Sequence, residues 1–130
     1  MLYINIFNTH QLPKANEYIS DIMIEKIKEE NPERIYNSYF VGGALVYNDI
    51  KPFATPIANA NELEMNVSKN LDCLNLDFYK VEDIYNFDYI LTYKNSPLEN
   101  LIKYDKDWEL IYSDIDNIKS FYKLSLYKKK

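Results

Sequence analysis

The spacing of apolar residues predicts the first element, an amphipathic helix from Pro13 to about Glu30. Apolar side chains recur every three or four residues along it, and charged residues take the other face. Proline disfavours helical geometry in the residue before it, so Asn31-Pro32 marks the end of the helix. The polar face is acidic, which favours packing on a sheet over binding to an anionic membrane.

Two short strands are predicted next, separated by the chain's only glycines. Arg34 to Asn37 forms the first strand and Ile50 to Ala54 the second. Gly42-Gly43 between them permits a sharp turn or a close approach of two backbones, followed by a short apolar helix through Tyr47.

Residues 59–86 are polar and have weak helical periodicity. Four apolar positions are spaced for one helix face after a candidate cap at Asn61: Leu63, Val67, Leu71 and Leu74. A second helical turn is predicted from Val81 to Tyr85.

The last third of the chain has the clearest pattern. The run YILTY from Tyr89 to Tyr93 favours β-structure and holds no charge, which predicts a central strand covered on both faces. Ser96, Pro97 and Glu99 then supply a cap, a first-turn proline and the partner of a capping box, so a helix begins there. The alternation WELIYS (108–113) predicts a strand. A turn over 114–117 is expected to return the chain as an antiparallel partner over 118–124.

This order of elements predicts a single α/β domain. We expect a mixed, mostly parallel sheet of about five strands, flanked by helices in two or three layers and ending in a β-hairpin. Residues 1–32 supply an N-terminal strand or linker and the amphipathic helix, and 33–124 form the core. Residues 125–130 are expected to be a basic tail, because three lysines at the end of a chain are usually solvated.

Composition narrows the function classes. The net charge of −5 argues against nucleic acid as a partner, because phosphate binding needs clustered Lys and Arg. No run approaches the roughly 20 apolar residues that cross a bilayer, and the first ten residues lack the features of a signal peptide. The chain taken alone is therefore expected to be soluble. Its thirteen tyrosines accompany abundant Asn, Lys and Ile, so we attribute them to AT-rich codons rather than to carbohydrate binding.

Catalytic and metal-ligating residues are sparse. His10, the only histidine, has no neighbouring metal ligand and is interpreted as a solvated loop residue, and Cys73 as a small core residue. The acidic side chains fall at helix starts, turns and strand ends, where such groups are ordinarily solvated: Asp72, Asp77, Glu82, Asp83, Asp88, Asp105, Asp107, Asp114 and Asp116. Residues 114–117 share part of a calcium-loop pattern but lack its glycine and distal glutamate. We expect no catalytic residue, metal or cofactor.

The best candidate patch surrounds the glycine pair, and its members are Tyr36, Asn37, Tyr39, Phe40, Gly42, Gly43 and Tyr47. Its aromatic side chains either fill the core above the sheet or stack on a sugar or a lipid-linked head group. The glycines either allow close packing or cradle a phosphate. No GxGxxG or GxxxxGK[ST] pattern surrounds them, which favours packing.

Two blocks of sequence carry a family resemblance. The first is IYNSYFVGGALVYNDIKPF, and the second is DYILTYKNSPLENLIKYDKDWELIYSDIDNIKSFYKL. They are similar to the extracytoplasmic C-terminal region of GT-C membrane glycosyltransferases, which follows the last transmembrane helix, and they cover about Glu33 to Leu124. Relatives commonly carry an Asp-Gly-Arg-type segment after the second strand. Here that place is taken by Ala54 to Asn59.

The resemblance implies a non-catalytic extracytoplasmic domain of a polytopic glycosyltransferase-like membrane protein. Such a domain would cap the membrane part or help position an acceptor or a lipid-linked sugar. The implied partners are the missing transmembrane region and a glycan or polyprenyl-phosphate sugar. On this view Met1 is not a native start, and Leu2 to Phe7 leads away from the last membrane helix. The family's catalytic carboxylates lie in loops that have no counterpart here.

Two other classes of function remain open. One is a stand-alone cytoplasmic binding protein, such as an immunity-type partner, that works through its aromatic surface. The other is a small enzyme that uses the Gly42-Gly43 loop.

Overall fold

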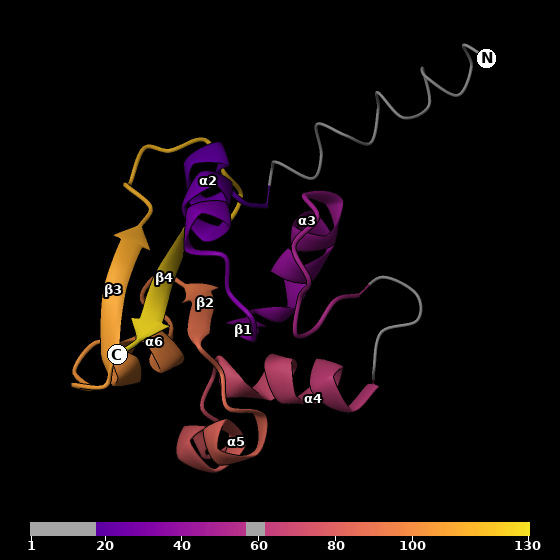
Figure 1. The fold of residues 1–130 in the computed structure, drawn as a ribbon, viewed down its shortest axis with the longest axis vertical. Coiled ribbons are helices and arrows are strands. Elements are labelled where there is room, and N and C mark those ends of the chain that lie inside the picture. The colour runs from indigo at the N-terminus through magenta and orange to yellow at the C-terminus, as the bar shows by residue number, and fades with distance from the viewer. Residues whose placement is uncertain (1–17, 57–61) are drawn as a thin grey trace.

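The computed structural model describes residues 18–56 and 62–130. In this part of the chain a four-stranded mixed sheet has the strand order β1-β2-β4-β3 (Figure 1). The strands are β1 (Ile35–Asn37), β2 (Tyr89–Tyr93), β3 (Trp108–Ser113) and β4 (Leu124–Lys129). β1 is parallel to β2, and β4 is antiparallel to both of its neighbours. The α/β class and the mixed sheet are confirmed, whereas the expected five strands and mostly parallel pairing are wrong.

Helices cover both faces of the sheet and make three layers. The helical elements are α2 (Asp21–Glu30), the 3₁₀ turn η1 (Tyr39–Val41), α3 (Gly42–Tyr47), α4 (Glu62–Leu71), α5 (Phe78–Tyr85) and α6 (Pro97–Ile102). One core cluster joins α2 and α3 to the sheet, and a second joins α4, α5 and α6 to its other face. None of the helices in the described ranges is long and apolar enough to span a membrane.

β2 confirms the prediction of a central strand covered on both faces. Tyr89 and Leu91 belong to the core beneath α2, and Ile90 belongs to the core on the opposite side. This alternation follows from the two-residue period of a strand, in which successive side chains point to opposite faces. The whole strand can therefore be uncharged, because both of its faces are covered by the core.

The predicted end of the first helix is confirmed, but its predicted course through residues 18–20 is wrong. α2 begins at Asp21, because Ser20 caps it by accepting a hydrogen bond from the Met23 amide, and Asn31 ends it in the left-handed conformation. Ser96 likewise accepts from the Glu99 amide at the start of α6. The Glu99 carboxylate, however, accepts from the Asn95 amide at 2.6 Å, because the Ser96 amide already donates to the Tyr93 carbonyl. Pro13 and residues 2–7 lie outside the described residues.

The predicted strand from Ile50 to Ala54 is absent. Its backbone is instead held by a side chain: the amides of Phe53 and Ala54 both donate to Oδ1 of Asn37. Because these groups bond to a carboxamide rather than to a neighbouring strand, the segment crosses the end of β1 without adding to the sheet.

The largest correction concerns the end of the chain. Residues 118–123 form a loop, and the closing strand is β4, which covers most of the expected basic tail. β4 lies inside the sheet, between β2 and β3. Leu124 and Leu126 pack in one core and Tyr127 packs in the other. The side chains of β4 therefore alternate between the two faces of the sheet, although the lysines that follow hide this pattern in the sequence. Lys129, one of the lysines of the expected tail, forms an ion pair with Glu82 of α5, in which Nζ lies 2.7 Å from Oε1.

The polar middle of the chain folds with shifted boundaries. α4 ends at Leu71, and Leu74 has a φ of 56° in the turn that follows, outside the helix face assigned to it. Cys73 lies in the same turn and is exposed, so its assignment to the core is wrong. α5 begins at Phe78, where Asp77 caps it. Asn61 lies outside the described residues.

Candidate functional site

The strand register gathers the ends of several elements at one end of the sheet. β1 and β2 run in the same direction, so the chain leaves both strands at this end, after Asn37 and after Tyr93. Tyr93 pairs with Leu124, the first residue of β4, and Ser113 at the end of β3 pairs with Ser125. We call this end of the sheet the carboxyl end. Crevices outside the carboxyl ends of parallel strands are the usual ligand sites of open α/β sheets.

A cavity of about 320 Å³ opens at the carboxyl end. Its walls come from η1, the end of α4 and the turn after it, the last residue of β2, and the start of α6. The residues that line it are Tyr39, Phe40, Lys69, Asp72, Cys73, Tyr93, Ser96 and Pro97.

The polar floor of the cavity is built around Asp72, which is only 7% exposed. Its Oδ1 accepts hydrogen bonds from the Thr92 hydroxyl at 2.8 Å and the Tyr36 hydroxyl at 3.2 Å. Burial raises the pKa of Asp72, and hydrogen bonds from Ser38, Thr92 and Tyr36 oppose part of that rise. A buried carboxyl stabilised by hydroxyl donors can accept or donate hydrogen bonds according to its protonation state.

Further hydroxyls extend this network between the strands. Thr92 Oγ1 lies 3.2 Å from Ser96 Oγ, and Ser38 Oγ donates to Thr92 at 3.2 Å. Tyr36 is fully buried, and burial together with the Asp72 charge raises its pKa well above the ordinary tyrosine value. Tyr36 therefore remains a neutral donor across the ordinary pH range.

Another part of the cavity lining consists of two aromatic rings and a lysine. Nζ of Lys69 lies 4.7 Å from the centre of the Tyr39 ring, and Phe40 packs edge-on against Tyr39 at 5.0 Å. Phe40 is 56% exposed. The Tyr93 hydroxyl is buried and has no hydrogen bond of ordinary geometry with any residue in the described ranges. Burial and the neighbouring Tyr122 and Asp72 raise the pKa of Tyr93.

Asn37 and Gly42, two members of the predicted patch, serve the fold rather than the cavity. Asn37 is fully buried and holds the backbone of Phe53 and Ala54. Gly42 has ordinary helical angles, yet a Cβ at this position would lie 2.0 Å from the Ala54 carbonyl oxygen. The glycine therefore permits a close approach of two backbone segments, as the packing alternative predicts.

The structure divides the predicted patch. Tyr39 and Phe40 line the cavity, whereas Tyr36 lies beneath its floor. Gly43 is half-buried within α3, and Tyr47, 44% exposed at the end of that helix, does not line the cavity.

Sequence reasoning missed most of the polar lining. Asp72 was grouped with solvated carboxylates, but it is buried, and so is Asp114. Thr92 and Ser96 were assigned only to a strand and a helix cap. The one local signal was a carboxylate beside apolar residues in the run LDCLNL, directly after a helix face.

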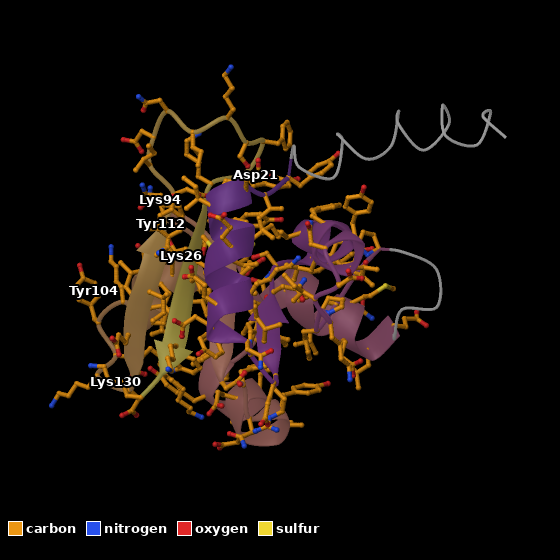
Figure 2. The ribbon with its side chains drawn as sticks, turned by 45° about the horizontal axis from the view of Figure 1, so that its top comes forward. Asp21, Lys26, Lys94, Tyr104, Tyr112 and Lys130 are labelled. Atoms are coloured by element: carbon orange, nitrogen blue, oxygen red, sulfur yellow. The ribbon has the colours of Figure 1, made fainter. Side chains whose placement is uncertain are left out.

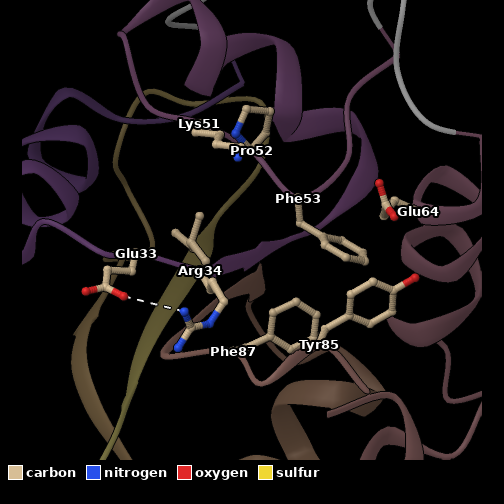
Figure 3. A pocket seen from close by; sticks show the side chains of 9 residues that line it. Glu33, Arg34, Lys51, Pro52, Phe53, Glu64, Tyr85 and Phe87 are labelled. Carbon is tan, nitrogen blue, oxygen red and sulfur yellow. Dashed lines mark hydrogen bonds and ion pairs between the residues drawn. The ribbon is translucent and has the colours of Figure 1, made fainter. Parts of the chain in front are cut away.

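A second cavity, of about 210 Å³, lies near the amino end of β1 (Figure 3). One wall is aromatic: Phe53 meets Tyr85 at 4.8 Å and Phe87 at 5.0 Å. Arg34 lies across from them, but its guanidinium is engaged by Glu33 at 3.4 Å and by the Asn86 carbonyl at 2.8 Å. We take the carboxyl-end cavity as the stronger candidate because one of its lining residues, Asp72, is a buried carboxyl that accepts hydrogen bonds from the Thr92 and Tyr36 hydroxyls.

The described residues contain no cluster of His, Cys, Asp and Glu that could hold a metal ion. His10 lies outside them. Comparison with known proteins gave no match to a family model, a curated protein or a solved structure.

Proposed function

We propose that this domain is a non-catalytic recognition module of a GT-C-like membrane glycosyltransferase, and that its carboxyl-end cavity holds a sugar. The extracytoplasmic setting and the membrane partner come from the sequence resemblance. The observation that carries the role of the cavity is the meeting of the Tyr39-Phe40 pair with the hydrogen-bonding floor at Asp72.

This lining suits a carbohydrate chemically. Sugar rings present apolar C–H faces and a rim of hydroxyls, so they need an aromatic surface beside groups that both donate and accept hydrogen bonds. Phe40 offers exposed ring surface in a lining that is mostly apolar, and Asp72 and Ser96 are among the polar residues of that lining. A volume of about 320 Å³ lies at the small end of ligand pockets, which favours one sugar unit over a polymer.

The same lining supports binding rather than glycosyl transfer. Asp72 is the one carboxylate among the described residues that line the cavity. Enzymes that act on glycosidic bonds ordinarily place two carboxylates across the reacting bond, with different protonation states. A single buried carboxyl held by hydroxyls orients a ligand but lacks the second group.

Titration of the domain with free hexoses and with a short-chain polyprenyl-phosphate sugar tests this function. We expect millimolar ligand to shift the amide resonances of Phe40, Lys69 and Ser96. Phe40→Ala should weaken binding severalfold, because it removes an exposed aromatic surface from the cavity rim. Tyr104→Ala is the matched control, since Tyr104 is 81% exposed and lies away from the cavity. The proposal fails if all of these sugars leave the three resonances unmoved.

A further inference from the structure

The cavity near the amino end of β1 has an apolar side and a charged side. It measures about 210 Å³, and Figure 3 shows the Arg34 side chain across the open space from three aromatic rings. Segments that are distant in the sequence supply its lining: residues 33–35, residues 51–53, Glu64 of α4, and Tyr85 and Phe87 at the end of α5. Such a combination can hold a ligand that has one apolar part and one charged part.

The apolar side is a packed unit of three rings. The Phe53 ring meets the rings of Tyr85 and Phe87 at angles of 81° and 89°, and the Tyr85 and Phe87 rings lie nearly parallel with their centres 5.7 Å apart. Phe87 is 2% exposed, whereas Phe53 and Tyr85 are half-buried. Because the rings pack against one another, an aromatic group can pack on them without rearranging this wall.

Arg34, the only arginine of the chain, is held in position by two neighbouring groups. The Asp88 carboxylate accepts hydrogen bonds from the backbone amides of Glu33 at 2.7 Å and Arg34 at 2.8 Å. Nε of Arg34 donates to the Asn86 carbonyl at 2.8 Å. These bonds orient the backbone and the side chain before a ligand arrives, so binding costs little additional side-chain entropy.

The Arg34 guanidinium keeps capacity for another acceptor. Nε is used by the Asn86 carbonyl, and Nη1 lies 3.4 Å from Oε2 of Glu33, but Nη2 makes no hydrogen bond with any residue in the ranges 18–56 and 62–130. The Glu33 contact is long and its carboxylate is 79% exposed, so a ligand carboxylate can displace it at little cost. Lys51, on the same cavity, forms no ion pair with the described residues.

Two carboxylates also belong to the lining, and their positions determine which ligand charge fits. In Figure 3, Glu33 lies on the side of Arg34 away from the rings, and the Phe53 ring lies between Arg34 and Glu64. Burial and then the Glu64 charge raise the pKa of Tyr85, which places this carboxylate beside the tyrosine. Glu33 is paired with Arg34, and Glu64 has interactions of its own. The unused hydrogen-bonding capacity of this cavity therefore belongs to its cations.

We propose that this cavity binds a small aromatic carboxylic acid. Its carboxylate pairs with Arg34 and Lys51, and its ring packs on the three aromatic side chains. A guanidinium matches a carboxylate in a planar, two-bond geometry that an ammonium group lacks. The volume lies below the usual range of ligand pockets, which suits one ring with a short acidic arm. The site is separate from the carboxyl-end cavity and does not depend on the proposed function.

A titration of the whole chain with three probes that share one phenylpropyl body tests this assignment. We expect millimolar 3-phenylpropanoate to shift the amide resonances of Arg34, Phe53 and Phe87. The uncharged 3-phenylpropan-1-ol should bind about tenfold more weakly, because it forms no charged hydrogen bond. 3-Phenylpropylammonium should bind least, because it meets Arg34 and Lys51 with a like charge. Equal binding of the three probes, or no shift with 3-phenylpropanoate, overturns the proposal.

Two variants separate the charged side of the cavity from its rings. Arg34→Gln and Lys51→Gln should each weaken binding of 3-phenylpropanoate severalfold and leave binding of the alcohol unchanged. Lys106→Gln is the matched control. Lys106 is exposed, forms no ion pair in the described part of the chain and precedes β3, at the sheet edge opposite β1, where Figure 2 labels Tyr104.

Lys51→Gln keeps the test decisive if Arg34→Gln fails to fold, which circular dichroism checks, because Lys51 is exposed and has no ion pair to lose within the described ranges. Wild-type affinity of Lys51→Gln for 3-phenylpropanoate overturns the proposal. A peptide that ends in phenylalanine presents the same chemistry, so N-acetylglycylphenylalanine is the last probe. It should bind more weakly than 3-phenylpropanoate, and tighter binding overturns the assignment to a small acid. Sugar binding is read from the resonances of Phe40, Lys69 and Ser96, so either proposal can fail while the other stands.

Discussion

Asn37→Ala tests the contact that fixes the segment next to the candidate site. The carboxamide is fully buried and makes four hydrogen bonds to backbone. Nδ2 donates to the carbonyls of Ala54 at 2.8 Å and Ser38 at 2.9 Å. Oδ1 accepts from the amides of Phe53 at 2.7 Å and Ala54 at 3.2 Å. Alanine retains the backbone of β1 and removes all four bonds.

The size of the effect follows from these bonds. A buried hydrogen bond contributes about 0.5–1.5 kcal/mol net, and a buried donor left without a partner costs about 1–3 kcal/mol. Phe53 is half-buried, so water can reach part of this segment after the substitution. We therefore expect Asn37→Ala to lower the free energy of unfolding by about 3–5 kcal/mol, a large part of the roughly 5–15 kcal/mol of a typical domain.

Urea unfolding measures this loss, and Asn48→Ala provides the control. Asn48 is also an asparagine next to α3, but its side chain makes one bond, from Nδ2 to the Ala44 carbonyl at 2.8 Å. We expect Asn48→Ala to lower the free energy of unfolding by about 1 kcal/mol. Equal losses in the two variants would refute the role of Asn37 as the anchor of residues 53–54. Hydrogen exchange at the Ala54 amide should accelerate in Asn37→Ala but not in Asn48→Ala.

Three further predictions concern stability. Gly42→Ala should destabilise the domain by about 1–3 kcal/mol in urea, because its Cβ would overlap the Ala54 carbonyl; an unchanged midpoint would contradict the close approach. Removal of residues 125–130 should abolish cooperative thermal unfolding, because it deletes most of an interior strand, whereas a true tail would be lost without effect. Burial raises the pKa of Asp72, so the folded chain keeps this proton at a pH where the unfolded chain has lost it. The free energy of unfolding therefore falls as pH rises from the ordinary aspartate range through the raised pKa, and Asp72→Asn should flatten this fall; parallel pH profiles would assign it to other groups.

Elements whose signals are local were predictable from the sequence. β2 has the predicted bounds because an uncharged run of five β-favouring residues suits no other place in a small domain. α6 begins where Ser96 and Pro97 indicate, since capping depends on residues within one turn. In both cases the neighbouring residues alone determine the structure.

β4 was missed because its position depends on distant partners. Local alternation is present in LSLY, but the following lysines resemble a solvated end. β4 is interior because it pairs with both β2 and β3, and neither pairing is visible from its own residues. The Ile50–Ala54 segment shows the reverse case. Its residues suit a strand, yet the Asn37 side chain takes its backbone hydrogen bonds.

The candidate site was predictable only in its aromatic part. Tyr39 and Phe40 adjoin the glycine pair in sequence, which drew attention to them. The polar floor joins residues 20 to 36 positions apart, as in the bonds from Thr92 and Tyr36 to Asp72. Such a network exists only after the crossover from β1 to β2 has closed, so no local pattern marks it.

Two buried polar groups at the carboxyl end depart from ordinary packing. A buried carboxyl at Asp72 and a buried Tyr93 hydroxyl without a well-formed hydrogen bond each reduce stability relative to a simple apolar core. Arg34 at the amino end of β1, by contrast, is paired with Glu33 and with the Asn86 carbonyl. Natural sequences break packing rules mainly where function requires it. The two buried polar groups beside the cavity therefore support the proposal that the carboxyl-end cavity binds a ligand.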